Sequence, residues 1–288
     1  MTPGFALTTL HAGALLFGLA GVLGKLTAAS ASMIVFGRAA FAVLALGLFM
    51  GVAGQARWQA LRPRHWLRLA ASGALLAGHW VAFFMAVKIA GVAVATLGFA
   101  SFPAFTVILE GLWFGERIRR HETLLVIAVS IGLILVIPDF DLGAGATVGL
   151  LWGVFSGLTF ALLSLVNRTS AANVPAVQAA LCQNLVVAAC LLPWAAPQTM
   201  TIAAIDWLWI ALLGVFCTGI AHSLFVASLA VIKARTAAVV FAMEPVYGIA
   251  FAWLAFAETP TPRMLAGGAL IVLAIVASGL RSSKNSVQ

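Results

Sequence analysis

Residues 103–116 read PAFTVILEGLWFGE, and residues 245–258 read PVYGIAFAWLAFAE. Both segments begin with proline, continue as an apolar run, and end with phenylalanine, a small residue and glutamate. Recurrence of such a pattern without a gap predicts an internal repeat. His79 lies 24 residues before the first proline and His222 lies 23 residues before the second, so the repeat extends upstream into both halves.

The composition predicts a membrane protein. Hydrophobic residues make up 63% of the 288 positions and charged residues only 8%, whereas a soluble domain carries about a quarter charged residues. In a bilayer every backbone polar group must be satisfied within the protein, which leaves helices or a closed barrel. The apolar runs are about twenty residues long, the length of a membrane-crossing helix. We therefore expect an all-α membrane protein.

The apolar runs predict ten transmembrane helices, five in residues 1–140 and five in residues 145–288. If the halves are homologous, an odd number of spans makes the second half enter the membrane from the opposite side, which is an inverted-topology repeat. The shortest separations lie at Lys88–Gly91 and Ile232–Arg235. The expected spans are Phe5–Leu26, Met33–Val52, Trp66–Val87, Val92–Phe114, Glu122–Ile137, Thr147–Val166, Pro175–Trp194, Trp207–Ala227, Thr236–Ala257 and Met264–Leu280.

The basic residues predict the orientation. With a cytoplasmic amino terminus, twelve of the sixteen Lys and Arg residues fall in inside loops and ends, as the positive-inside rule requires. Both termini are then cytoplasmic. The net charge of +8 comes from these loops and not from a nucleic-acid-binding stripe, so we expect no nucleic-acid partner. The three cysteines lie inside apolar runs without the spacing of metal ligands, and we expect no metal or cofactor.

Four local signals point to a known family: Phe-Gly-Glu at 114–116, Phe-Ala-Glu at 256–258, Glu-Pro at 244–245, and Lys25 with Arg38 at the first hairpin. Together with two sets of five spans, they resemble the drug/metabolite transporter superfamily, in particular its ten-span members with two EamA-type repeats. Within it the chain is most similar to the YddG-type aromatic amino acid exporters. The sequence departs from symmetry at Gln183, which falls about where Arg38 lies in the first half.

The resemblance implies a secondary transporter of the bacterial inner membrane that exports small metabolites by alternating access. Its expected substrates are aromatic or other apolar amino acids, and we expect it to work as a monomer in the lipid bilayer. No nucleotide-binding loop or catalytic constellation is visible, so we expect no enzyme activity. One alternative is an exporter of lipophilic drugs or organic cations, for which Glu244 would be the ligand. A second is a membrane receptor or scaffold that transports nothing.

Polar and aromatic residues inside the spans are the candidates for substrate contact, because a polar group in the bilayer needs a partner or a task. His79 could bind a substrate or only a neighbouring helix, and Glu244 could bind a substrate or pair with a cation. Most phenylalanines are explained by packing or lipid contact. The candidate substrate-binding residues are His79, Trp80, Phe83, Phe99, Ser101, Phe17, Phe155, Phe160, His222, Phe241 and Glu244.

Prolines and glycines inside the spans are the candidate hinges. Pro245 removes one backbone donor, and we expect a helix interruption there and at Pro103. Gly21 and Gly153 belong to the first span of each half, where small residues permit close helix approach. We interpret Arg38 first as a residue that snorkels to the interface or fixes the first hairpin, and second as an attractor of anions.

Overall fold

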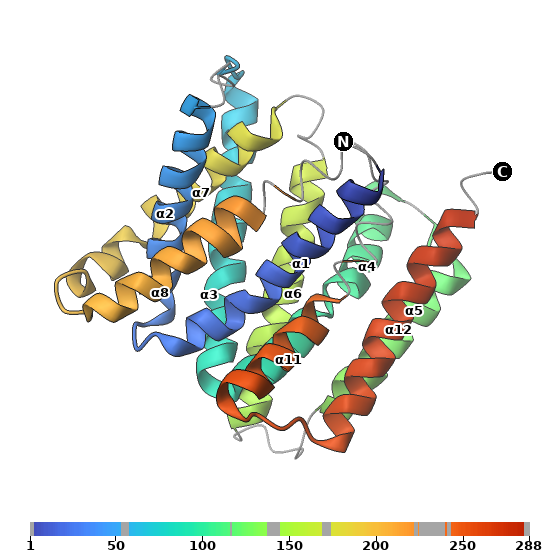
Figure 1. Ribbon diagram of the computed structural model, residues 1–288. Coiled ribbons are helices and arrows are strands. Elements are labelled where there is room, and N and C mark those ends of the chain that lie inside the picture. The colour runs from blue at the N-terminus through green and yellow to red at the C-terminus, as the bar shows by residue number, and fades with distance from the viewer. Residues whose placement is uncertain are drawn as a thin grey trace.

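A computed structural model gives the fold (Figure 1). The structure describes residues 3–52, 58–115, 117–136, 145–168, 174–221, 224, 240 and 243–284. Within these ranges the regular structure is entirely helical. The helices are α1 (Pro3–Leu26), α2 (Ala31–Val52), α3 (Pro63–Phe99), α4 (Phe102–Phe114), α5 (Arg120–Val136), α6 (Gly145–Arg168), α7 (Ala176–Ala195), α8 (Ala204–Gly214), α11 (Glu244–Phe256) and α12 (Pro262–Lys284).

Each expected span has a helix at its place as far as the described residues reach. Five helices are long and apolar enough to cross a membrane by length and composition: Gly4–Leu26, Ala31–Val52, Pro63–Phe99, Gly145–Asn167 and Val177–Gln198. Shorter apolar helices occupy Phe102–Phe114, Ala204–Ile220, Glu244–Phe256 and Pro262–Ser278. The chain is a multi-pass membrane protein.

The third and fourth expected spans are divided differently from the sequence prediction. Gly91 has φ 82° and ψ 172°, a conformation that side chains disfavour, and it breaks α3 at the short separation seen in the sequence. A second break follows Phe99, where Ser101 donates from its hydroxyl and its backbone N–H to the carbonyl of Gly98. The fourth expected span therefore consists of two pieces, Val92–Phe99 and α4.

Pro103 and Pro245 begin helices rather than interrupt them. Each is the second residue of a 13-residue helix, where the missing backbone N–H has no partner to lose. Both helices also end alike, on a left-handed residue that stops the helix: Gly115 (φ 66°) after α4 and Ala257 (φ 53°) after α11. The repeated sequence pattern thus encodes one local structure twice.

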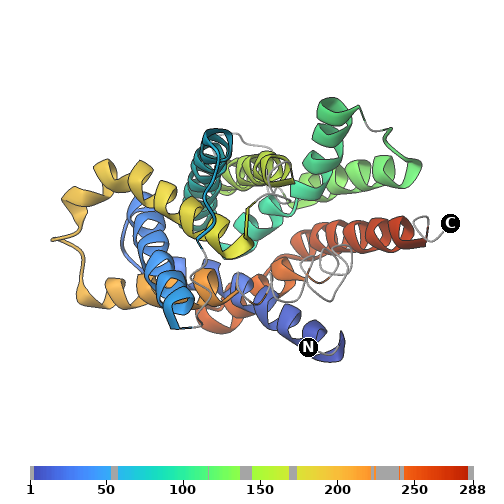
Figure 2. The same cartoon turned by 90° about the horizontal axis from the view of Figure 1, so that it is seen from above.

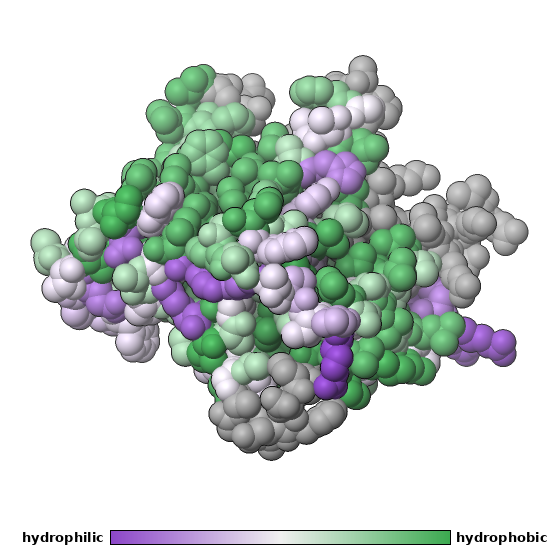
Figure 3. Space-filling model, turned by 60° about the horizontal axis from the view of Figure 1, so that its bottom comes forward, coloured by the Kyte–Doolittle hydropathy of each residue, from purple (hydrophilic) through white to green (hydrophobic). Residues whose placement is uncertain are grey.

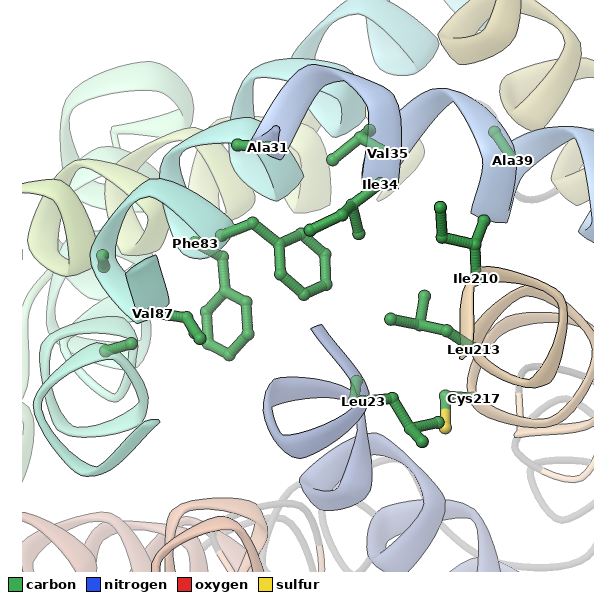
Figure 4. Packing of buried hydrophobic residues seen from close by; sticks show 14 of the residues in the cluster. Leu23, Ala31, Ile34, Val35, Ala39, Phe83, Val87, Ile210, Leu213 and Cys217 are labelled. Carbon is green, nitrogen blue, oxygen red and sulfur yellow. The ribbon is translucent and has the colours of Figure 1, made fainter. Parts of the chain in front are cut away.

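Helix packing follows a regular scheme. Helix α6 packs along α3 and α4, while α1 packs against α11 and α8. Two further pairs complete the bundle: α2 lies against α7, and α5 lies beside α12 (Figures 1 and 2). The largest buried cluster joins α1, α2, α3 and α8 around Phe84, Ile34 and Ile210. Figure 4 shows its apolar side chains converging from these helices.

Glycines permit the closest helix contacts. A Cβ atom added to Gly98 of α3 would lie 2.9 Å from the Cα atom of Gly153 in α6. At the contact between α1 and α11, a Cβ atom on Gly18 would lie 2.8 Å from the Cβ atom of Tyr247. Real Cβ atoms do not approach this closely, so these positions require glycine.

The surface is mostly apolar, as expected for a protein solvated by lipid. Large hydrophobic side chains such as Leu48, Leu112, Leu254 and Leu273 are more than three-fifths exposed. In Figure 3 apolar residues cover most of the visible face, and hydrophilic residues occupy limited patches. A water-soluble monomer rarely exposes so much apolar surface.

Polar contacts join the two halves near the end of α1. Lys25 forms an ion pair with Glu258, which follows α11, and its ammonium also lies 4.8 Å from the ring centroid of Phe256. The carboxylate of Glu258 lies over the broken backbone at Gly91. Nearby, Asp206 of α8 accepts a 2.8 Å hydrogen bond from the backbone of Ala28. Charged groups therefore hold α1, α3, α8 and α11 together at this end.

Candidate functional site

An aromatic cluster surrounds His79. It consists of His79 and Phe83 of α3, Phe99 at the end of α3, Phe102 at the start of α4 and Phe160 of α6. The His79 ring centroid lies 5.0 Å from that of Phe99 and 4.9 Å from that of Phe160. Phe102 stacks on Phe99 at 5.2 Å and meets Phe160 edge-on at 5.2 Å. These are preferred distances for aromatic pairs.

Ser156 of α6 fixes the orientation of His79. The Ser156 hydroxyl lies 2.7 Å from Nδ1 of His79, and it can donate to the His79 carbonyl oxygen at 3.1 Å. Nδ1 also lies 3.1 Å from the Ser156 carbonyl oxygen. With the proton on Nδ1, these contacts leave Nε2 as an acceptor. Nε2 makes no hydrogen bond with any described residue, so its acceptor position is unused within that part of the chain.

The break after Phe99 builds this cluster. It places Phe99 and Phe102 on either side of a turn, so both rings face Phe160 instead of following one straight helix. The turn packs against Gly157 of α6, where a Cβ atom would lie 2.5 Å from the Ser101 hydroxyl oxygen. Ser101 therefore shapes the turn, and its hydroxyl is directed to the Gly98 carbonyl.

A charged group lies on Trp80, the residue that follows His79 in α3. Arg38 of α2 is only 3% exposed, and its guanidinium carbon lies 3.9 Å from the ring centroid of Trp80 and 5.5 Å from that of Phe84. Its Nε and Nη2 atoms donate to the hydroxyl of Thr218 at 3.1 and 2.9 Å. Arg38 is thus buried among helices and does not snorkel, which corrects our first interpretation.

A helical irregularity positions Thr218. Residues Val215–Ile220, which continue α8, form a π-helix, a structure often found at functional sites. The Thr218 hydroxyl donates to the carbonyl oxygen of Leu213, five residues earlier, at 3.1 Å. Its oxygen then accepts from Arg38, so one hydroxyl links α2 to α8. Nothing in the sequence pattern indicated this segment.

Glu244 is the second charged group of this region. It is the first residue of α11 and is partly buried. Within the described residues, Glu244 and Arg38 form no ion pair.

The structure brings together only some of the predicted site residues. His79, Phe83, Phe99 and Phe160 meet in the aromatic cluster, and Trp80 lies on Arg38. Phe155 does not join them: it is 47% exposed and contacts Trp152 on the outer side of α6.

Other predicted residues have different surroundings. Phe17 is partly buried in α1. Gly21 packs against Val92 and Phe83 at the contact between α1 and α3, so it is a packing position, as is Gly153. His222 and Phe241 lie outside the described residues.

Two residues near these groups were not candidates from the sequence: Thr218 and Gly91. Gly91 was visible only as the glycine in the short separation after Lys88. Thr218 carried no pattern, because its partner Arg38 lies 180 residues away in the chain. Phe102 and Ser156 were identifiable as an aromatic and a polar residue inside a span, but the sequence did not show that they meet Phe99 and His79.

Comparison with known proteins agrees with this architecture. A Pseudomonas aeruginosa protein named pseudopaline exporter CntI is 27% identical over 251 residues, covering 86% of this chain and 85% of that protein. An uncharacterized transporter from Archaeoglobus fulgidus is 26% identical over 194 residues, covering 67% of this chain and 69% of that one. A crystal structure with 20% identity shares the fold at a TM-score of 0.65, covering 98% of this chain and 99% of the other.

The chain also matches the EamA-like transporter family twice, over residues 4–137 and over residues 147–280. The two matches cover nearly all of the sequence. Members of this family and the named relatives are transporters and not enzymes. The chain therefore belongs to the EamA-like transporter family within the drug/metabolite transporter superfamily.

Proposed function

We propose that this transporter exports aromatic or other apolar amino acids across the bacterial inner membrane, as the YddG-type exporters do. The observation that carries the proposal is the aromatic cluster with the free acceptor Nε2 of His79 in its middle. Aromatic rings provide an apolar surface for a side chain. A neutral imidazole nitrogen accepts a hydrogen bond from an ammonium group. Export as the direction is supported by the likeness to a protein named as an exporter.

The transport mechanism we propose is alternating access between two inverted repeats, residues 1–140 and 145–288, each with five spans. Support comes from the packing scheme. If α6, α7, α8, α11 and α12 correspond to the five spans of the first half, the α1–α11 contact corresponds to α6–α4, and α2–α8 corresponds to α7–α3. The α2–α7 and α5–α12 contacts each join one element to its own counterpart. A pseudo-two-fold axis produces this set of contacts.

Orientation and assembly complete the proposal. Helix α1 begins and α12 ends at the same end of the bundle in Figure 1, as an even number of spans requires. The distribution of basic residues favours a cytoplasmic location for that end. Each candidate residue lies within one chain, so we propose that the monomer transports.

Transport by purified protein in liposomes tests the proposal. We expect counterflow of L-phenylalanine and L-leucine, and a loss of about tenfold in His79→Ala, the range for a hydrogen bond to a charged group. His121→Ala in α5 is the matched control and should transport normally, because His121 lies in the first turn of α5, which follows the end of α4 opposite Phe102. Absence of amino acid flux in the wild-type protein would refute the assignment.

One alternative is supported by a specific residue. Glu244, a carboxylate at the start of α11, could bind a lipophilic cation. In that case cationic dyes move and amino acids do not, Glu244→Gln abolishes transport, and His79→Ala leaves it unchanged. A receptor or scaffold without transport has no support, because the chain belongs to a transporter family.

A further inference from the structure

Arg38 is a buried cation whose contacts are all neutral. Its guanidinium lies on Trp80 and Phe84 and donates to Thr218, and each of these partners is uncharged. Within the part of the chain that the structure describes, no carboxylate lies within ion-pair distance of it. Arg38 is the eighth residue of α2, about 10 Å along the helix from its first residue.

The guanidinium also keeps unused donors. Nε and Nη2 share the Thr218 oxygen, while Nη1 donates to no described residue. The stacking on Trp80 fixes the plane of the group, so the direction of the free donors is fixed as well. An arginine in this state is prepared for an anion, because planar guanidinium groups bind carboxylates through two parallel hydrogen bonds.

The charge of the region selects the kind of anion. Arg38 is a single cation with no described carboxylate within ion-pair distance, so one carboxylate of a ligand matches its charge. A dianion such as phosphate would bring one more negative charge than this cation can balance. A zwitterion fits better, because its carboxylate can bind near Arg38 while its ammonium remains near a hydrogen-bond acceptor or a carboxylate.

We propose that Arg38 is the carboxylate-binding residue of the substrate site, with Trp80 and Thr218 positioning its guanidinium. The inference rests on the proposed function and names the residue that recognises the carboxylate of the amino acid. Buried charges in membranes are costly, and an anion delivered by the substrate compensates this cost during transport.

The wild-type protein provides the first test, which needs no variant. In liposomes, L-phenylalanine should have a half-saturation concentration at least about tenfold lower than L-phenylalaninamide, which lacks the carboxylate charge. Equal half-saturation for the acid and the amide overturns the proposal about Arg38 while leaving amino-acid-like transport standing.

Variants then show whether Arg38 is responsible for the preference for the free carboxylate over the amide. Arg38→Gln should raise the half-saturation concentration of L-phenylalanine at least about tenfold and change that of the amide less than about twofold. Arg38→Lys keeps the charge and loses the two-donor geometry, so it should retain part of the preference. Gln183→Leu in α7 is the control: it removes a buried polar group bound to Ser72 and Asn167, and the preference should persist. Equal weakening of acid and amide transport in Arg38→Gln indicates a structural role only.

A binding measurement separates this inference from the proposed function. If the wild-type protein moves no amino acid, the proposed function fails, and thermal stability in detergent still tests Arg38. 3-Phenylpropionate should raise the melting temperature of the wild-type protein more than 3-phenylpropanol does, and this difference should vanish in Arg38→Gln. Equal shifts with the acid and the alcohol in the wild-type protein contradict carboxylate binding at Arg38.

Discussion

Helices α4 and α11 share one backbone design and differ in chemistry. Both have 13 residues, carry proline at the second position and end on a left-handed residue. The first residue of α4 is Phe102, which belongs to the aromatic cluster, while the first residue of α11 is Glu244. The repeated sequence pattern therefore determines the same backbone structure in both helices. The side chains at equivalent positions differ, so α4 begins with an aromatic residue and α11 with an acidic one.

The largest effect is expected from Glu244→Gln if the carboxylate of Glu244 binds a lipophilic cation. Transport of cationic dyes should then fall roughly a hundredfold, since hydrogen bonds to charged groups contribute up to about 3 kcal/mol, while transport of L-phenylalanine through the aromatic cluster should change less than about twofold. Phe102→Leu at the equivalent position of α4 should instead weaken L-phenylalanine relative to L-leucine only a fewfold. Initial rates of uptake into liposomes measure both, and similar effects of the two variants on both substrates would remove the contrast between the helices.

Replacing the packing glycines should destabilise the α3–α6 contact and the α1–α11 contact by similar amounts. Gly98→Ala places a Cβ atom against the backbone of Gly153, and Gly18→Ala places one against Tyr247, so each should destabilise the protein by about 2 kcal/mol. Gly47→Ala in α2 meets no atom within 4 Å and should be neutral or slightly stabilising. Thermal unfolding in detergent distinguishes them. A tolerated Gly98→Ala would show that α3 and α6 can separate at little cost.

A smaller effect is expected from replacing Ser156, which orients the His79 ring. Ser156→Ala removes the hydroxyl that contacts Nδ1 and should cost about 1 kcal/mol, or about fivefold in transport. Ser130→Ala in α5, whose hydroxyl bonds only to the carbonyl of Val126, serves as the control. Unchanged flux in Ser156→Ala would mean that the Ser156 carbonyl alone orients the ring.

The smallest effects are expected at the left-handed residues that end the two helices, Gly115 after α4 and Ala257 after α11. Gly115→Ala forces a side chain into a left-handed conformation and should destabilise by about 1 kcal/mol. Ala257→Gly removes such strain and should stabilise by about 0.5 kcal/mol. Opposite shifts of the melting temperature are the expected outcome, and shifts of the same sign would contradict equivalent helix ends.

Hydrophobicity and the recurring Pro-to-Glu pattern determined the helical class, the places of the helices and the family resemblance. These features are local: run length sets the span, proline starts a helix, and a small residue ends it. His79 and Phe99 were also identifiable, because His222 and Phe241 occupy the equivalent positions of the second half. Phe83 and Phe160 were candidates only as aromatic residues inside the spans.

Only the tertiary structure decided which of these residues meet. Contacts between residues far apart in sequence depend on helix packing, which leaves no trace in single-chain periodicity. Thus Ser156 came to orient His79, the π-helix brought Thr218 to Arg38, and Phe155 turned outward. Arg38 shows the reason most clearly: the sequence places a cation in an apolar span, but burial against Trp80 is what turns it from a snorkelling residue into a candidate carboxylate-binding site.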